Sequence, residues 1–224
     1  MNDAPVISCE GLKKSFADGD GEVLAGVSLA VRAGETLCIS GASGSGKTTL
    51  LHLLGGLDKP DGGYAAADGK KWAEINSAQA AKLRNRMLGF VFQFHLLLPE
   101  FSALENAAMP LLIRGVPRDE ARNVARETLR QLGLAACAEK RPGQMSGGER
   151  QRTAVARALA GKPACLLADE PTGNLDRKNA ETVFALMLES AAASGAAVVV
   201  VSHDERLAVR AGRRAALTDG VLRE

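Results

Sequence analysis

The sequence has little net charge, few cysteines and no long apolar run, and each absence excludes a class of protein. The formal net charge is +2 over 224 residues, so charge alone does not indicate nucleic-acid binding, and we expect no nucleic-acid partner. The four cysteines include no CxxC pair, which argues against a zinc site. Cys38 and Cys165 lie inside apolar runs, which is typical of buried, reduced thiols in a reducing compartment.

Signals for membrane insertion and secretion are also missing. The longest apolar stretch, AAASGAAVVVVS, falls short of the ~18–20 residues that cross a bilayer. The first ten residues, MNDAPVISCE, lack the basic region and apolar core of a signal peptide. We therefore expect a soluble protein, and any action at a membrane would need a partner that crosses it.

What is present is typical of a packed α/β domain. Apolar residues make up 46% of the chain and charged residues 24%. Four short runs are apolar without alternation, namely residues 35–40, 88–92, 164–168 and 196–202. Such runs indicate strands that are buried on both faces, as in a parallel sheet. Helical patterns lie between them, at 47–57 and 177–194, and this order predicts an α/β core.

Two other regions depart from this pattern. The first thirty residues contain alternating segments separated by Gly and Asp, which predicts an antiparallel β element. Residues 94–160 contain no clear strand, and 118–133 place apolar side chains on one helical face. We therefore predict one domain over 1–224. Its α/β core, with the antiparallel element, covers 1–93 and 161–224, and an inserted helical lobe covers 94–160.

Glycine or polar residues follow each of the four apolar runs. They are Gly41, Gln93, Asp169 with Glu170, and His203. Ligands of open parallel sheets bind outside the carboxyl ends of the strands. The convergence of these residues on one edge therefore predicts a ligand site there.

The segment GASGSGKTT predicts a phosphate-binding loop. Gly41, Gly46, Lys47 and Thr48 match G-x-x-x-x-G-K-[ST] between a strand and a helix. Glycines let backbone N–H groups close around phosphate oxygens, and the following helix directs its positive end at them. Lys47 would reach the β- and γ-phosphates, and Thr48 would bind Mg²⁺. The candidate ATP-binding residues of this loop are Gly41, Ala42, Ser43, Gly44, Ser45, Gly46, Lys47, Thr48 and Thr49.

Residues at the ends of the other strands add candidate catalytic groups. Asp169 would hold Mg²⁺, and Glu170 would orient or deprotonate an attacking water. His203 would contact a γ-phosphate or help to place the water, although a lone histidine is more often a packing or capping residue. Gln93 would contact ATP, bind Mg²⁺ or a water, and link nucleotide state to the position of the helical lobe.

A second candidate anion site lies in the helical lobe. Ser146 would cap the predicted helix 147–161, and Gly147 and Gly148 leave its first N–H groups open. One phosphate loop already covers one side of a nucleotide. We therefore expect Ser146, Gly147, Gly148 and Glu149 to serve the nucleotide of a second copy, related by a two-fold axis.

Six motifs in this order resemble those of ABC transporter nucleotide-binding subunits over nearly the whole chain. They are GASGSGKTT, Gln93, MSGGE, CLLADE, GNLD and His203. The resemblance implies an α/β ATPase in which two subunits hold two ATP molecules head to tail. It further implies that Phe16 stacks on adenine, where tyrosine is usual, and that Asp176 lies at the dimer interface. Met145 and Glu149 differ from the commonest signature, LSGGQ, but the Ser-Gly-Gly core remains.

Within that family, the segments 50–60, 88–113 and 145–159 resemble the ATPase subunits of lipoprotein-releasing complexes. This resemblance implies two integral-membrane permease partners of the LolC/LolE type and a peripheral position on the cytoplasmic face of a bacterial inner membrane. In the stretch 93–100, Phe94, Leu96 and Leu97 are consistent with core packing and with a groove for a permease helix, and the two interpretations are compatible.

Other functions have less support. A related ABC subunit of the macrolide-exporter or cell-division type would share every ATP motif and differ in its permease. An ABC ATPase of DNA repair or translation would usually carry coiled-coil arms or two cassettes. A P-loop kinase would lack SGGE and GNLD, and a non-catalytic scaffold would not need Lys47, Asp169, Glu170 and His203 together.

Overall fold

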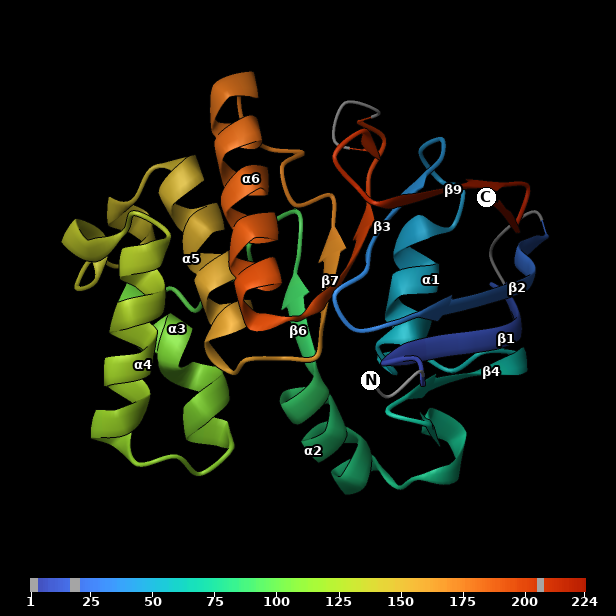
Figure 1. Cartoon of the computed structure of the whole chain (residues 1–224), viewed down its shortest axis with the longest axis horizontal. Coiled ribbons are helices and arrows are strands. Elements are labelled where there is room, and N and C mark those ends of the chain that lie inside the picture. Colours follow the sequence, from blue (N-terminus) through green and yellow to red (C-terminus); the bar gives the residue numbers. More distant parts are fainter. Residues whose placement is uncertain (1–3, 17–20, 205–207) are drawn as a thin grey trace.

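In the computed structural model, which describes residues 4–16, 21–204 and 208–224, the chain forms two sheets covered by helices (Figure 1). The larger sheet has the strand order β10-β9-β3-β8-β7-β6, and the smaller has the order β2-β1-β4-β5. The larger sheet contains β3 (Thr36–Ser40), β6 (Leu88–Val91), β7 (Cys165–Asp169), β8 (Ala197–Val201), β9 (Arg213–Thr218) and β10 (Val221–Arg223). The smaller contains β1 (Ile7–Ser15), β2 (Glu22–Val31), β4 (Gly62–Ala67) and β5 (Lys70–Lys71).

The four strands predicted from apolar runs are β3, β6, β7 and β8, and they pair in parallel. Their unbroken apolar character follows from burial on both faces. In β7, Leu166 and Ala168 join one hydrophobic core, whereas Cys165 and Leu167 join a second core on the opposite face. The same alternation continues through β8. The predicted α/β fold with a mostly parallel sheet is confirmed.

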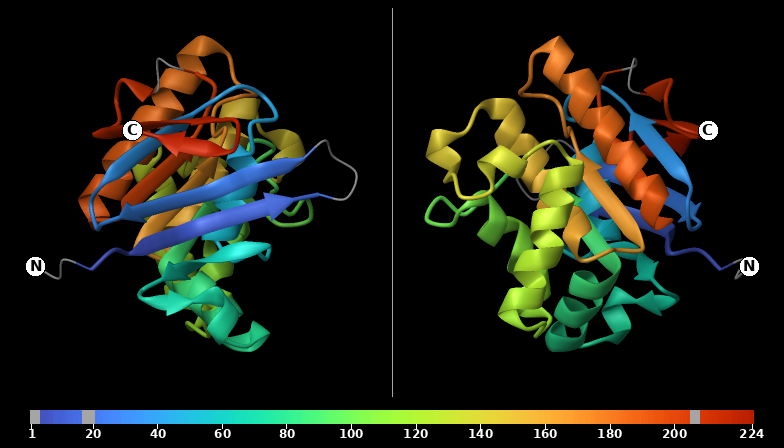
Figure 2. Two further views of the ribbon diagram at one scale, coloured as in Figure 1. Left: turned by 90° about the vertical axis from the view of Figure 1, so that its right-hand side faces the viewer. Right: turned by 60° about the vertical axis from the view of Figure 1, so that its left-hand side comes forward.

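Between the two sheets lies α1 (Lys47–Leu54), whose Leu50, Leu51, Leu53 and Leu54 are buried in the core that the sheets share. The antiparallel pairing of β1 with β2 and with β4 confirms the antiparallel element that was predicted for the N-terminal region. Figure 2 shows β2, β1 and β4 side by side across one end of the molecule, with α1 behind them.

Helices cover the other face of the parallel sheet (Figure 1). They are α5 (Gly147–Ala160), which lies against β6, and α6 (Arg177–Ser194), which lies against β8, while α3 (Ala103–Ile113) and α4 (Arg118–Gln131) pack in turn against α5. Asp176 caps the first turn of α6 by accepting from the N–H of Asn179, and Gly195 ends the helix at φ 72°. The predicted helix 177–194 therefore has these bounds. In α4, Ala121, Ala125 and Leu129 are buried, as predicted from their spacing.

The sequence did not indicate every element. Strands β4 and β5 extend the antiparallel sheet, α2 (Ser77–Met87) leads into β6, and β9 and β10 extend the parallel sheet on its far side. Short 3₁₀ turns occur at η1 (Trp72–Glu74), η2 (Ala135–Cys137) and η3 (Pro142–Gln144). Among the described residues, no helix combines the length and the apolar character needed to cross a bilayer.

Candidate active site

The loop between β3 and α1 needs glycine at several positions. Gly44 and Gly46 have φ values of 81° and 93°, which side-chain-bearing residues rarely adopt. A Cβ at Gly46 would also lie 2.8 Å from Cγ1 of Val23, and one at Gly41 would lie 2.6 Å from the carbonyl oxygen of Leu217. No side chain caps α1, so its first N–H groups remain open to an anion in the loop.

Lys47 is the first residue of α1, and its side chain turns back over the loop. Its ammonium donates to the carbonyl oxygens of Gly41 and Ala42, at 2.8 Å each. Only 7% of Lys47 is exposed. Neither carbonyl neutralises the charge, so the ammonium remains a strong partner for a phosphate oxygen.

Thr48 and Asp169 meet at the end of β7. The Thr48 hydroxyl donates to Oδ1 of Asp169 at 3.1 Å. Burial raises the pKa of Asp169, and the Thr48 hydrogen bond only partly opposes this effect. Mg²⁺ favours hard oxygen ligands, usually one or two carboxylates with substrate phosphates and water, and this pair fits that preference. No group of three or more His, Cys, Asp or Glu side chains suited to a metal occurs in 4–16, 21–204 and 208–224. One carboxylate and one hydroxyl leave room for phosphate oxygens and water, which is the usual coordination of Mg²⁺ in nucleotide sites.

Glu170 follows Asp169 in a left-handed backbone conformation, with φ 43°. Its Oε1 accepts from the backbone N–H of His203 at 2.9 Å and lies 2.8 Å from His203 Nδ1. Its Oε2 accepts from the Ser202 hydroxyl at 3.0 Å. The loops after β7 and β8 therefore fix the Glu170 carboxylate in one orientation. The left-handed backbone conformation of Glu170 costs about 1–3 kcal/mol.

Lys47, Thr48, Glu170 and His203 line one cavity of about 580 Å³, whereas Gly41 and Asp169 are not among its lining residues. It is lined by Phe16, Val23, Ser43, Gly44, Gly46, Lys47, Thr48, Thr49, Gln93, Glu170 and His203. Ala42 and Ser45 instead line an adjoining cavity of about 430 Å³. The Phe16 ring is half-exposed, at 48%, with the Lys14 ammonium 5.3 Å from its centroid. Most of the predicted ATP-binding residues thus line the same cavity.

The serine-glycine motif does not line that cavity. Ser146 caps α5, as predicted, because its Oγ accepts from the N–H of Glu149 at 3.2 Å. The Glu149 carboxylate accepts in return from the Ser146 N–H at 2.6 Å, which completes a capping box. The capping box does not use the N–H groups of Gly147 and Gly148, which lie in the first turn of α5. Asp176 caps the neighbouring α6, and its bonds to Asn179 lower its pKa.

The segment 92–97 connects the cavity to the helices. Gln151 donates to the carbonyl oxygen of Phe92 at 3.1 Å, and Asn174 donates to that of Gln93 at 2.9 Å. Leu97 is buried, as core packing predicts, but Phe94 and Leu96 are 67% and 57% exposed. Core packing is therefore wrong for Phe94 and Leu96, because the chain turns them outward at the left-handed residues His95 and Leu96.

An apolar groove of about 430 Å³ begins at this segment. Its lining comes from α2, β6, α3 and α5, and it includes Leu57, Phe90, Phe92, Leu96, Met109 and Ile113. Ile113 is 70% exposed. A large apolar groove on an otherwise polar surface marks an interaction site.

Sequence reasoning missed three residues of the site. Val23 lines the cavity from β2, and no sequence signal pointed to it. Ser202 holds Glu170, and its place at the end of the apolar run before His203 was a usable signal. Asn174 lies inside the GNLD motif but acts on Gln93, in a different loop.

The fold and the site together define a class of protein. A glycine-rich phosphate loop joins β3 to α1, and β7 ends in Asp169, the hydrogen-bond partner of Thr48, followed by Glu170. This is the arrangement of a P-loop nucleoside-triphosphate-binding protein. The family model described as ABC transporter matches residues 24–173. The chain belongs to the ABC transporter family.

Individual relatives match almost end to end. The chain is 54% identical to the lipoprotein-releasing system ATP-binding protein LolD of Bordetella pertussis, over 97% of this chain and 95% of that protein. It is 51% identical to the LolD of Legionella pneumophila, over 99% and 98%. A solved structure described as the dimeric post-hydrolysis state of the ATP-binding cassette MJ0796 bound to ADP and Pi has a TM-score of 0.88 and 37% identity, covering 97% of each chain.

Proposed function

We propose that this chain is the ATP-hydrolysing subunit of an ABC complex that powers the release of lipoproteins from the inner membrane toward the outer membrane. The observation that carries the ATPase assignment is the cavity that brings Lys47, Thr48, Gln93, Glu170 and His203 together. The near end-to-end similarity to two LolD proteins supports the choice of lipoprotein release over a macrolide-exporter or cell-division role.

ATP binds in the cavity with its adenine on the Phe16 ring and its phosphates in the loop. The ammonium of Lys47 exchanges the Gly41 and Ala42 carbonyls for phosphate oxygens. Thr48, Asp169 and Gln93 would hold Mg²⁺, which would supply charge neutralisation to the bound phosphates. Binding of a cation beside Asp169 also offsets the desolvation that raises the pKa of that carboxyl.

Glu170 positions and deprotonates the attacking water. Its carboxylate is fixed by Ser202 and by the His203 N–H, so little reorganisation accompanies the reaction. His203, in the loop after β8 with Ser202, assists, and its ring contacts Glu170. Phosphoryl transfer to water depends mainly on such positioning and on electrostatic stabilisation.

The second half of each site comes from another copy of the chain. Ser146, Gly147, Gly148 and Glu149 are outside the cavity lining, yet they form a helix start with open N–H groups and a hydroxyl free to donate. In a two-fold dimer, the Ser146 hydroxyl and the N–H groups of Gly147 and Gly148 contact the γ-phosphate bound to the partner, while the Glu149 carboxylate keeps its place in the helix cap, and Asp176 lies at the interface. The dimeric solved relative supports this arrangement.

Complementation tests the shared site directly. Lys47→Ala removes the phosphate ligand. Ser146→Asp keeps an N-cap of equal quality but sets a negative charge before the phosphate. Each variant alone should lose at least about a hundredfold in ATPase rate. In a 1:1 mixture, each heterodimer contains one intact site and one doubly altered site, so we expect activity to return. A mixture as inactive as its parents would contradict the composite site.

The apolar groove receives a cytoplasmic segment of a permease of the LolC/LolE type, which holds the subunit at the cytoplasmic face of the inner membrane. Ile113→Glu places a charge in the groove and should abolish permease binding and lipoprotein release in proteoliposomes, while basal ATPase activity persists. Val221→Glu, on the exposed strand β10, is the matched control. Release that continues in the Ile113→Glu variant would reject the groove. Stimulation by an exporter-type permease, but not by a LolC/LolE pair, would reject the lipoprotein assignment.

A further inference from the structure

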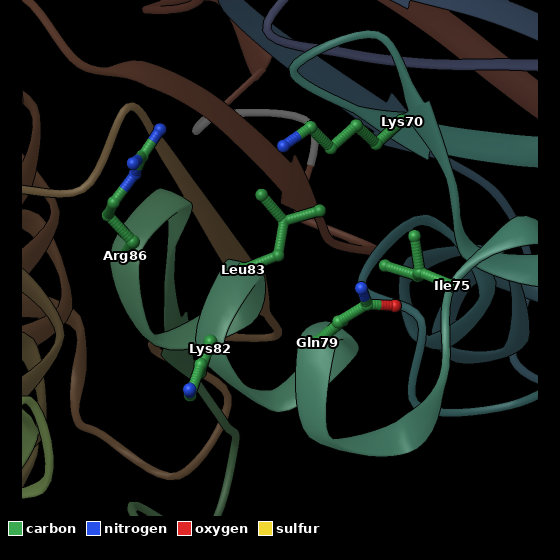
Figure 3. A pocket seen from close by; sticks show the side chains of 6 residues that line it. All are labelled: Lys70, Ile75, Gln79, Lys82, Leu83 and Arg86. Carbon is green, nitrogen blue, oxygen red and sulfur yellow. The ribbon is translucent and has the colours of Figure 1, made fainter.

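Helix α2 separates the apolar groove from a second cavity with different chemistry. Arg84 and Asn85 line the groove. The opposite face of the helix lines a cavity of about 400 Å³ together with the β5 region (Figure 3). The lining residues of this second cavity are Lys70, Ile75, Gln79, Lys82, Leu83 and Arg86.

Positive charge is concentrated around this cavity. Helix α2 contains Lys82, Arg84 and Arg86 and no acidic residue, and β5 adds two lysines beside it. We call Lys70, Lys71, Lys82 and Arg86 the α2 basic surface; Arg84 is not part of it, because it faces the groove and donates to the carbonyl oxygen of Gly56. A surface that carries several positive charges attracts an anionic partner.

Only part of this charge is balanced within the chain. Arg86 lies 3.6 Å from Asp68, and Lys71 lies 3.6 Å from Glu74. Both pairs are exposed, so they contribute little stability and exchange partners easily. The side chains of Lys70 and Lys82 form no hydrogen bond or ion pair with any residue in the described part of the chain. Their ammonium groups are available to an external anion.

The cavity also has an apolar part. In Figure 3 the Lys70 side chain extends across the cavity above Leu83, and Arg86 reaches up from the far end of the same helix. Leu83 is 8% exposed and lies between these two cations. A lining that combines cations with apolar side chains suits a phosphate group joined to an apolar unit, as in a phospholipid.

We propose that the α2 basic surface binds the anionic headgroups of membrane phospholipids. The proposal rests on the proposed function, because a membrane-embedded partner seated in the groove brings the shared helix α2 to the bilayer surface. Clusters of four to eight lysine and arginine residues beside a membrane attract its anionic leaflet, and each contributes about fivefold to binding. Phospholipid contact would orient the subunit and support the permease in holding it.

Vesicle flotation of the full-length protein tests this idea. The vesicles contain either 40% phosphatidylglycerol in phosphatidylcholine or phosphatidylcholine alone. We expect binding only to the anionic vesicles, and weaker binding at high salt because screening shortens the reach of the charges. The double variant Lys70→Gln/Lys82→Gln should bind the anionic vesicles about thirtyfold more weakly at low salt.

A charge-matched variant separates this site from overall charge. Arg210→Gln/Arg223→Gln removes two exposed cations from the C-terminal part of the chain, and Arg223 lies on β10, away from α2 (Figure 1). It should bind vesicles within twofold of the unaltered protein. Equal losses in both double variants, or equal binding to both kinds of vesicle, would overturn the proposal.

ATP hydrolysis measured without vesicles distinguishes this proposal from the proposed function. Neither Lys70 nor Lys82 lines the nucleotide cavity, so both double variants should hydrolyse ATP at the rate of the unaltered chain. A flotation result against the proposal, combined with normal hydrolysis and permease binding, would reject only the phospholipid contact. Absence of ATP hydrolysis in the unaltered chain would reject the function itself.

Discussion

The thiol of Cys137 donates to Oε1 of Glu149 across 2.9 Å, which links the 3₁₀ turn η2 to the start of the signature helix α5. Lys140 lies 3.7 Å from the same oxygen. The other oxygen of Glu149 accepts from the Ser146 N–H. An acidic side chain at the start of the predicted anion-binding helix is thus held by the Cys137 thiol, the Lys140 ammonium and the Ser146 N–H.

This contact predicts how Cys137 variants behave. Cys137→Ala removes a donor to a carboxylate and should lower the free energy of unfolding by about 1.5–3 kcal/mol, whereas Cys137→Ser keeps a donor and should cost less. The loss from Cys137→Ala should shrink in a Glu149→Gln background, because the charged acceptor is gone. Urea unfolding of the four-protein cycle measures this coupling. Additive losses would mean that Cys137 only fills space.

Glu149 also makes the free energy of unfolding depend on pH in the acid range. The Cys137 thiol, the Ser146 N–H and hydroxyl, and Lys140 lower the pKa of Glu149 from 4.5 to about 2. The native state therefore binds fewer protons than the unfolded chain in this range. The stabilisation is complete above pH 4.5 and is lost as the pH falls toward 2. Glu149→Gln should flatten this part of the curve of unfolding free energy against pH, and an unchanged curve would contradict the shift.

The pKa of Asp169 is shifted in the opposite direction to that of Glu149, so its effect on stability has the opposite dependence on pH. Burial raises its pKa above 3.8, so the native state binds more protons, and stability falls as the pH rises from 3.8 through the folded-state pKa. Without nucleotide, Asp169→Asn should therefore have a higher free energy of unfolding than the unaltered chain at pH 7, and the difference should vanish at pH 3. Its Mg²⁺-dependent ATPase rate should fall by at least about a hundredfold. A less stable Asn variant at pH 7 would contradict the desolvation argument.

Glu170→Gln is expected to separate binding from turnover. Glutamine retains the size of the side chain and can still accept from the His203 N–H, but it cannot take a proton from water. ATP affinity should stay within about threefold, while turnover falls by about 10²–10⁴. Equilibrium nucleotide binding, single-turnover hydrolysis and size-exclusion chromatography with ATP measure the three consequences, the last being an accumulated dimer. Normal turnover would remove Glu170 from the catalytic role.

The parallel core could be predicted from sequence because burial on both faces leaves a direct record. Every residue of β8, and every residue of β7 except Asp169, meets one core or the other, so the runs at 164–168 and 196–202 are apolar up to the final Ser202. Strand β4, by contrast, is GGYAAA, and neither its glycines nor its alanines favour a strand. Its place depends on pairing with β1, which is a tertiary effect.

The candidate site shows the same division. The P-loop, Asp169, Glu170 and His203 were predictable because their chemistry requires particular residues at fixed spacing beside apolar strands. The supporting contacts were not. Asn174 and Gln151 hold carbonyl oxygens 81 and 59 residues away in the chain, and single long-range hydrogen bonds leave no periodic pattern in a sequence.

Arg157 is the sharpest example of such a contact, and it provides the last prediction. Its guanidinium donates to the carbonyl oxygens of His95, at 2.8 Å, and Leu96, at 2.6 Å. These two residues have φ values of 43° and 45°, a conformation that carries strain. Burial lowers the pKa of Arg157, yet the two carbonyls compensate the buried charge. Arg157 therefore fixes the outward turn that exposes Phe94 and Leu96 at the groove.

Arg157→Gln should leave both carbonyls without this donor and lower the free energy of unfolding by about 1–3 kcal/mol. Basal ATPase activity should persist, because Arg157 does not line the nucleotide cavity, whereas stimulation by permease should fall several-fold as the groove edge relaxes. Arg157→Lys keeps the charge but loses the planar fork that binds two carbonyls at once, so its effects should be intermediate. Urea unfolding and ATPase assays with and without permease measure both effects. Full permease stimulation in the Gln variant would show that the strained turn does not depend on this side chain.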